Sequence, residues 1–334
     1  MPAAFAVLAV VGAGNAVLNV AMNVSGAAAE EVLNRTLMPR LHAAFSLGSL
    51  VGAGSAVLLA SAGVPVGPHA AGAGLAAAAA LVVLVRGLPA DAPTRVPAPA
   101  PAADVPAVAP DVGTGRAPSA WREPQVLLIG SVVFGAAFAE GSANDWIGLV
   151  VVDDHHIGQG AGAAVLGVFL TAVLLTRLAG ARVLDRFGRV LVVRASAGCA
   201  AAGLALVVLA PTAPVAVLGV ALWGTGTALG FPVGMSAAAD DPTRAAARVG
   251  VVSTVGYGAF LVGPPLIGAL GERVGLSRAL LVVLVAVLLS GAAAGAVRAP
   301  RRDAASSGGI RGPLRGCSTS PPRASRRPPG AAAP

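Results

Sequence analysis

The chain alternates between long apolar stretches and short polar segments. An apolar stretch of about 20 residues is long enough to cross the hydrocarbon core of a membrane as a helix. Nine such stretches occur, and none of them contains a lysine. They run over residues 3–24, 42–63, 68–86, 125–150, 159–180, 189–210, 213–235, 249–270 and 276–297. The pattern therefore predicts an all-α, polytopic membrane protein with about nine transmembrane helices.

The composition agrees with this fold class. Of the 334 residues, 56% are hydrophobic and only 11% are charged, whereas soluble domains carry about 25% charged residues. The 44 glycines favour helices that pack closely inside a bilayer. Two cysteines, Cys199 and Cys317, are too few for a disulfide framework. The first stretch has no basic segment before it, so we expect a helix there rather than a cleaved signal peptide.

The arginines predict the orientation, because cytoplasmic loops of membrane proteins retain positive charge. Of the 23 arginines, 21 fall in alternate segments on one side, and only Arg273 and Arg278 fall on the other. Five of the 21, between residues 177 and 194, are assigned to one loop region. We therefore expect a plasma-membrane protein with its C-terminus in the cytoplasm and, with nine helices, the first residue outside.

The stretches divide the chain into four parts. Residues 1–86 hold three predicted helices, and residues 123–298 hold six. Between them, residues 87–122 contain eight prolines and predict an extended cytoplasmic linker. Residues 299–334 predict a disordered Arg/Pro-rich tail. Nearly all of the net charge of +8 comes from Arg298 onward, so the basic excess is no folded basic face and no nucleic-acid partner is expected.

Two segments of the chain look like copies of each other. A glycine-rich helix, an acidic and then basic loop and a second glycine-rich helix occur at residues 11–54 and again at 223–268. The acidic pair Glu30-Glu31 corresponds to Asp240-Asp241. Similar composition alone is the alternative explanation, but the matching loop charges favour a repeat. If these two segments are aligned in this way, three helices of the second part have no counterpart in the first part.

The loop ARVLDRFGRV resembles the signature loop of the major facilitator superfamily, because Asp185, Arg186, Gly188 and Arg189 match its pattern. Ala181 and Val190 depart from it. The resemblance implies helices 4 to 12 of a twelve-helix transporter, truncated at its N-terminus. The stretch FAEGSANDWIGLVVVDD also resembles the seventh helix of a branch of bacterial permeases that includes fucose-permease-like proteins.

Ionisable groups at membrane depth are costly and are candidates for function. Glu140 is the clearest case, with Asn144 one turn later and Asp145 beside it. Glu140 is a candidate for substrate binding or for carrying a coupling proton, since burial would raise the pKa of its carboxyl group. A structural glutamate bonded to a neighbouring helix is the alternative.

Other polar residues lie inside the predicted spans. Asn15, Asn19 and Asn23 are four residues apart and form one polar stripe, which would bind a substrate or join helices. Trp223 and Thr227 occupy the corresponding place in the repeat. We interpret Trp223 as a membrane-interface residue, with stacking on a sugar or an aromatic drug as the alternative. Tyr257 faces either a cavity or a helix contact, and His42 is either titratable or structural.

No enzyme, cofactor or metal motif is present. Asp153, Asp154, His155 and His156 are consecutive, so they cannot all point at one ion from a helix, and a polar turn is the simpler explanation. The sequence thus predicts a secondary transporter that moves a small organic solute through the bilayer by alternating access, with protons as a coupling ion. The alternative is a transport-incompetent fragment or a membrane interaction protein.

Overall fold

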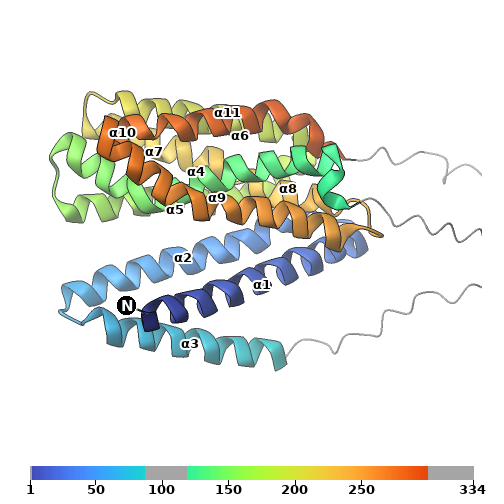
Figure 1. The fold of residues 1–334 in the computed structure, drawn as a ribbon, viewed down its shortest axis with the longest axis horizontal. Coiled ribbons are helices and arrows are strands. Elements are labelled where there is room, and N and C mark those ends of the chain that lie inside the picture. Colours follow the sequence, from blue (N-terminus) through green and yellow to red (C-terminus); the bar gives the residue numbers. More distant parts are fainter. Residues whose placement is uncertain (1, 87–118, 300–334) are drawn as a thin grey trace, which may run out of the picture. The chain divides into compact units, whose positions relative to one another are not determined.

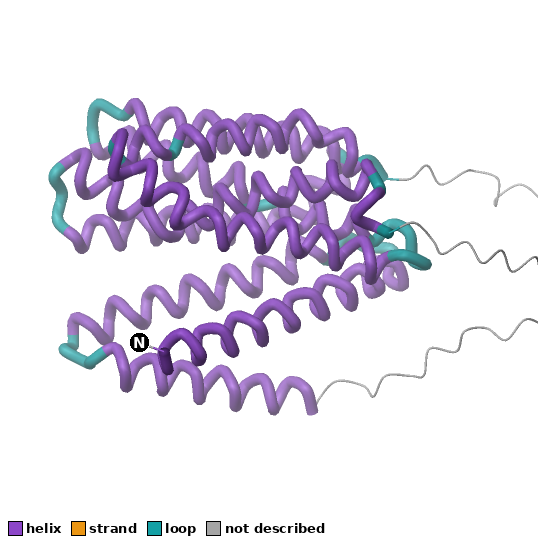
Figure 2. The backbone as a smooth tube through the Cα atoms, in the orientation of Figure 1, coloured by secondary structure: helices purple, strands orange, loops and turns teal. Residues whose placement is uncertain are grey.

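The computed structural model describes residues 2–86 and 119–299. These residues form helices joined by short loops, and no strand occurs among them (Figures 1 and 2). The predicted all-α fold class is confirmed. The predicted tail and residues 87–118 of the predicted linker lie outside the described residues. The last residues of that linker form a short 3-10 helix, η1 (Ala120–Arg122), which packs against α4 and α9.

Three helices precede the predicted linker: α1 (Pro2–Leu33), α2 (Met38–Ser61) and α3 (Val66–Arg86). The remaining helices follow it (Figure 1). They are α4 (Pro124–His155), α5 (Gln159–Phe187), α6 (Arg189–Leu209), α7 (Ala213–Thr227), α8 (Gly230–Ala238), α9 (Ala245–Val274), α10 (Leu276–Ala279), α11 (Leu281–Ala293) and the 3-10 helix η2 (Ala294–Val297).

Within the described residues, eight segments are long and apolar enough to cross a membrane. Each coincides with one of the stretches that the sequence predicts. The ninth predicted stretch, residues 3–24, lies inside the 32-residue helix α1. Several helices extend beyond the predicted apolar stretches, and α5 continues to Phe187, where Gly188 ends it with a φ of 74° that favours glycine. Three arginines therefore belong to α5 itself: Arg177, Arg182 and Arg186.

The core of the last six spans is built around α4 and the α7–α8 span. In their most apolar windows, 72% of the α4 residues and 61% of the α7–α8 residues are buried, against none for α3. Small residues allow the backbones to approach. A Cβ atom on Gly226 of α7 would lie 2.1 Å from the backbone nitrogen of Ala200 in α6. Only glycine is compatible with that crossing.

The span predicted at residues 213–235 is interrupted at Ala228 and Leu229, between α7 and α8. The cause lies four residues beyond Ala228. Pro232 has no backbone N–H, so the carbonyl oxygen of Ala228 cannot receive the usual helical hydrogen bond. A buried carbonyl without a donor is unfavourable, and it needs a partner from another helix.

Candidate functional site

The polar centre of the molecule is an ion pair between α4 and α5. Nη2 of Arg177 lies 2.6 Å from Oε2 of Glu140, and the two side chains are 2% and 12% exposed. Arg177 is ten residues from the end of α5 at Phe187, about 15 Å along the helix axis. That is about half the thickness of a hydrocarbon core. The pair therefore lies near mid-depth of the membrane-spanning region.

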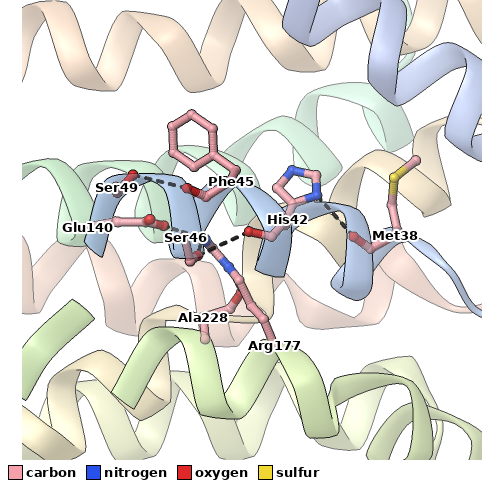
Figure 3. A network of polar contacts seen from close by, with 8 residues as sticks. All are labelled: Met38, His42, Phe45, Ser46, Ser49, Glu140, Arg177 and Ala228. Atoms are coloured by element: carbon pink, nitrogen blue, oxygen red, sulfur yellow. Dashed lines mark hydrogen bonds and ion pairs between the residues drawn. The ribbon is translucent and has the colours of Figure 1, made fainter. Parts of the chain in front are cut away.

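Arg177 makes two further contacts to other parts of the molecule (Figure 3). Its Nε donates a hydrogen bond to the carbonyl oxygen of Ala228 at 3.1 Å, which supplies the donor that Pro232 cannot provide. Its Nη1 donates to Oγ of Ser46 in α2 at 2.5 Å. One buried guanidinium thus contacts the carboxylate on α4, the break between α7 and α8, and the second helix of the N-terminal part.

The α2 side of this centre is polar but uncharged. Oγ of Ser46 also donates to the carbonyl oxygen of His42 at 3.0 Å. Nδ1 of His42 lies 3.1 Å from the carbonyl oxygen of Met38, so Nδ1 is the protonated nitrogen and Nε2 keeps a free lone pair. Nε2 is buried and has no hydrogen-bond partner within the described part of the chain. The imidazole packs against the ring of Phe231, with 5.4 Å between centroids.

A second unpartnered group lies at the same level. Asn23 of α1 is completely buried, and both polar atoms of its amide lack a partner among the described residues. A Cβ atom on Gly26 of α1 would touch Leu41 and Met38 of α2. Asn23 lies about one turn from Gly26, on the side away from the α1–α2 loop, and is therefore level with His42. Buried amides are ordinarily hydrogen-bonded. Asn23 and His42 therefore offer a free donor and free acceptors on α1 and α2, and His42 lies one turn from Ser46, which contacts Arg177.

The other predicted site residues are not joined to this centre. Asn144 and Asp145 are exposed on α4, beyond Glu140. Asn19 is half-buried one turn before Asn23, and the side chain of Asn15 lies outside the described residues. Tyr257 is half-buried on α9, and its hydroxyl has no partner in the described ranges.

Trp223 corrects the interpretation made from the sequence. It is not a membrane-interface residue, because it is fully buried and its ring stacks edge-on against Phe169, with 5.8 Å between centroids. Thr227, one turn later, is also buried and lines an internal cavity of about 20 Å³ together with Gly230 and Ser290. The hydroxyl of Thr227 lacks a partner among the described residues. That volume accommodates about one water molecule.

A second polar network joins the loops at the end of the molecule where most described arginines lie, here called the basic end. Arg189, from the signature loop, contacts both carboxylate oxygens of Asp240, at 2.7 and 2.9 Å, and Oγ of Ser236 at 2.8 Å. Ser236 donates to Oε2 of Glu30 at 2.7 Å. The acidic residues Glu30 and Asp240, which correspond in the proposed repeat, thus meet around one arginine and one serine.

The remaining signature-loop residues take different positions at the basic end. Asp185 accepts a hydrogen bond from the hydroxyl of Thr36 at 2.7 Å, which is a second contact to the first three helices and their loops. Arg186 is exposed and lies over the ring of Phe187 at 5.5 Å. Burial raises the pKa of Asp240 above its usual value, although the neighbouring Arg189 acts to lower that pKa. Desolvation therefore outweighs ion pairing at Asp240.

The most important residue of the centre, Arg177, is placed wrongly by the sequence analysis. The count of charged loops assigned it to the basic side, but it is buried inside α5. Two signals were available: Arg177 lies within the apolar stretch 159–180, and Pro232 leaves one carbonyl without a donor. No sequence pattern pointed to Ser46. Its role depends on the contact between α2 and α5.

Polar groups buried at mid-depth among apolar helices define a class, the multi-pass membrane proteins with an internal polar site. The family comparison is more specific. The family model described as Major Facilitator Superfamily matches residues 1–264 and 146–329. The chain therefore belongs to the major facilitator superfamily.

Curated relatives agree with this membership. The chain is 32% identical over 165 residues to membrane protein MosC of Rhizobium meliloti, and 34% identical over 175 residues to an uncharacterised transporter of Sinorhizobium fredii. Each match covers 49% of this chain, and 40% and 46% of those proteins. An uncharacterised MFS-type transporter of Yersinia pestis is 28% identical over 308 residues, 89% of this chain and 73% of that protein. The chain thus spans less than half the length of the first two relatives. No solved structure matches it.

Proposed function

We propose that this chain is a secondary transporter that moves a small organic solute by alternating access around the Arg177–Glu140 pair. The observation that carries the proposal is the position of this pair. It lies at mid-depth, and Arg177 bridges α2 of the first three helices to α4 and the α7–α8 break of the last six. Charged groups in that position are costly, and in membrane proteins they mark ion and solute pathways.

The mechanism follows from which contacts join the two parts. Arg177–Ser46 joins them at mid-depth, and Thr36–Asp185 and Glu30–Ser236 join them at the basic end. We propose that the basic end is cytoplasmic and that these contacts close that side while solute enters from the other. Breaking them would open the basic end. In transporters of this kind, two groups of helices rock around a midplane site.

Glu140 is the proposed carrier of a coupling proton. When its carboxylate takes up a proton, its ion pair with Arg177 is lost, and Arg177 becomes free to hold another group. Asn144, one turn along the same face of α4 and exposed, is the proposed entry contact for the solute. Asn19 and Asn23 of α1 are proposed to contact it from the other side.

Reconstituted proteoliposomes test the proposal without knowledge of the solute. Vesicles containing the chain are given a mixture of sugars, organic acids, amines and amino acids under an inward proton gradient, and retained solutes are identified by mass spectrometry. We expect at least one solute to accumulate, and accumulation to collapse with a protonophore and in Glu140→Gln. A matched control is Ser49→Ala, because Ser49 lies on α2 but bonds only to the carbonyl oxygen of Phe45 in the described structure (Figure 3). Retention no greater than in empty vesicles would refute transport.

A membrane interaction protein is the second candidate, and one observation favours it. Residues 71–86 of α3 are all exposed, so this helix presents an apolar surface on every side. Such a surface suits either lipid or the helices of a partner. A stable complex with another membrane protein, together with the absence of any transported solute, would support this candidate.

A further inference from the structure

Only one of the two groups in the ion pair can lose its charge. A guanidinium stays protonated in proteins, whereas a carboxylate can take up a proton and become neutral. Arg177 is 2% exposed, so it needs a negative partner at all times. Leaving a buried charge without a partner is strongly destabilising. Any event that removes Glu140 from Arg177 must therefore supply another anion.

The geometry also indicates which member of the pair moves. Arg177 is fixed by Ala228 and Ser46 in addition to Glu140. Glu140 has one described side-chain contact, to Arg177, and is the more exposed of the two at 12%. If another anion binds at this site, it therefore replaces the carboxylate of Glu140, and the guanidinium of Arg177 stays in place.

Among the described residues, the surroundings of the pair supply hydrogen-bonding groups and no second charge. His42 Nε2 and the amide of Asn23 are buried and lack partners in the described chain. Of the described helices packed against α4, α7, α8 and α11 carry no titratable residue, and α9 contributes Tyr257 at this depth. The other charged residues of α5, Arg182, Asp185 and Arg186, lie nearer the end of that helix at Phe187. Asp145 on α4 is exposed beyond the pair. Once Glu140 is neutral, the centre carries the single positive charge of Arg177, which matches one monoanion.

We infer that the transported solute is a small organic monocarboxylate, which takes the place of Glu140 on Arg177 while Glu140 binds one proton. The inference rests on the proposed transport function. The step is balanced: one O–H bond forms on Glu140 with a proton from water, one ion pair is broken and one is formed. The buried net charge stays at zero, so the anion and the proton enter together. A guanidinium fork suits a carboxylate, with which it forms two parallel hydrogen bonds.

Shape-matched probes test the solute class on the full-length chain in detergent. Three sets differ in charge at one position: galacturonate, galactose and 6-amino-6-deoxygalactose; benzoate, benzamide and benzylamine; hexanoate, hexanamide and hexylamine. We expect a thermal shift with the carboxylate of at least one set and none with its neutral and cationic partners. Shifts with only neutral or cationic members, or no shift with any carboxylate, would overturn the inference.

The pH dependence of that binding tests the role of Glu140. Because one proton binds with each carboxylate, the apparent Kd should rise about tenfold per pH unit between about pH 6 and pH 8.5. In Glu140→Gln, which keeps the shape, the carboxylate should bind with a Kd that changes less than about twofold over this range. His42→Gln should keep the slope of the wild type, whatever its affinity. A slope that survives in Glu140→Gln, or that is lost in His42→Gln, assigns the proton to another group and overturns the inference.

The two proposals fail in different ways. Accumulation of a neutral or cationic solute in proteoliposomes leaves the transporter function intact and refutes the carboxylate. Proton-linked binding of a carboxylate that is never carried across the membrane leaves the site intact and refutes the transporter.

Discussion

The molecule contains the same chemical arrangement twice, at two depths. At the centre, Arg177 pairs with Glu140 and bonds to Ser46; at the basic end, Arg189 pairs with Asp240 and bonds to Ser236. In both, a serine hydroxyl connects an arginine–carboxylate pair to the first three helices, directly at Ser46 and through Glu30 at Ser236. The pairs differ in burial. The side chains are 2% and 12% exposed at the centre, against 24% and 21% at the basic end.

Because of this difference in burial, the two arginine–carboxylate pairs are suited to different roles. Solvent and salt screen charges near a surface, so an exposed pair contributes little and can open easily. A buried pair resists separation because each unpaired charge would remain in an apolar environment. The basic end is therefore suited to open and close, whereas the centre is suited to exchange one anion for another without losing its charge balance.

The largest expected effect comes from breaking the central pair. Glu140→Leu leaves Arg177 buried without a negative partner and should lower the free energy of unfolding by about 3–5 kcal/mol. The measurement is reversible unfolding in detergent micelles. The double variant Glu140→Leu with Arg177→Leu removes both charges and should recover most of the loss, since a buried pair and an apolar pair are often similar in stability. A double variant as unstable as the single one would contradict a charge-based explanation.

The serine at the centre gives the next effect. Ser46→Ala removes an acceptor from the buried guanidinium and should cost about 1.5–3 kcal/mol, the range for hydrogen bonds to charged groups. Ser49→Ala on the same helix removes a hydrogen bond of the same kind, from a serine to the carbonyl oxygen four residues earlier, at a half-buried position away from Arg177. It should cost less than about 0.5 kcal/mol. Equal costs for the two variants would show that Arg177 gains nothing from Ser46.

At the basic end the effect should be smaller and should depend on salt. Arg189→Gln breaks the pair with Asp240 and should cost about 1 kcal/mol at low ionic strength. Raising the salt to about 1 M should remove most of that difference, because the Debye length falls to about 3 Å. The cost of Glu140→Leu should be unaffected by the same change. If the stability cost of Arg189→Gln did not change with salt, the two networks would be equally shielded from solvent. The proposed difference between the centre and the basic end would then be wrong.

Much of the fold could be predicted from the sequence, because a bilayer imposes a simple length and polarity rule on each helix. The apolar stretches coincide with the eight described spans, and Gly188 ends α5 as a turn glycine. The candidate site was predicted only in part. Glu140 stood out because a carboxylate is rare at membrane depth, but a lone sequence position does not reveal whether a partner faces it.

The partners depend on packing between distant segments. Arg177 and Ser46 are 131 residues apart, and Glu30 and Ser236 are 206 apart. Arg177 resembled a loop residue because it lies near the end of its apolar stretch, and the continuation of α5 to Phe187 places it well inside the helix. Trp223 was misjudged for a similar reason. Tryptophan in a membrane helix is typical of the interface, whereas the burial of Trp223 is determined by α6 and by Phe169 of α5.

The smallest expected effect concerns the pH dependence of the basic end. Burial raises the pKa of Asp240 in the folded protein. A raised pKa means that the folded state binds this proton more tightly than the unfolded chain, so charged Asp240 costs stability above that pKa, and acidification removes the cost. Asp240→Asn lacks this titration. Between about pH 7 and pH 4, the stability of the wild type relative to Asp240→Asn should therefore rise, by less than about 1 kcal/mol. The comparison cancels the other carboxylates, which both proteins share. A relative stability that falls on acidification would mean that the ion pair with Arg189 outweighs burial, and the basic end would then resemble the centre more closely than its exposure suggests.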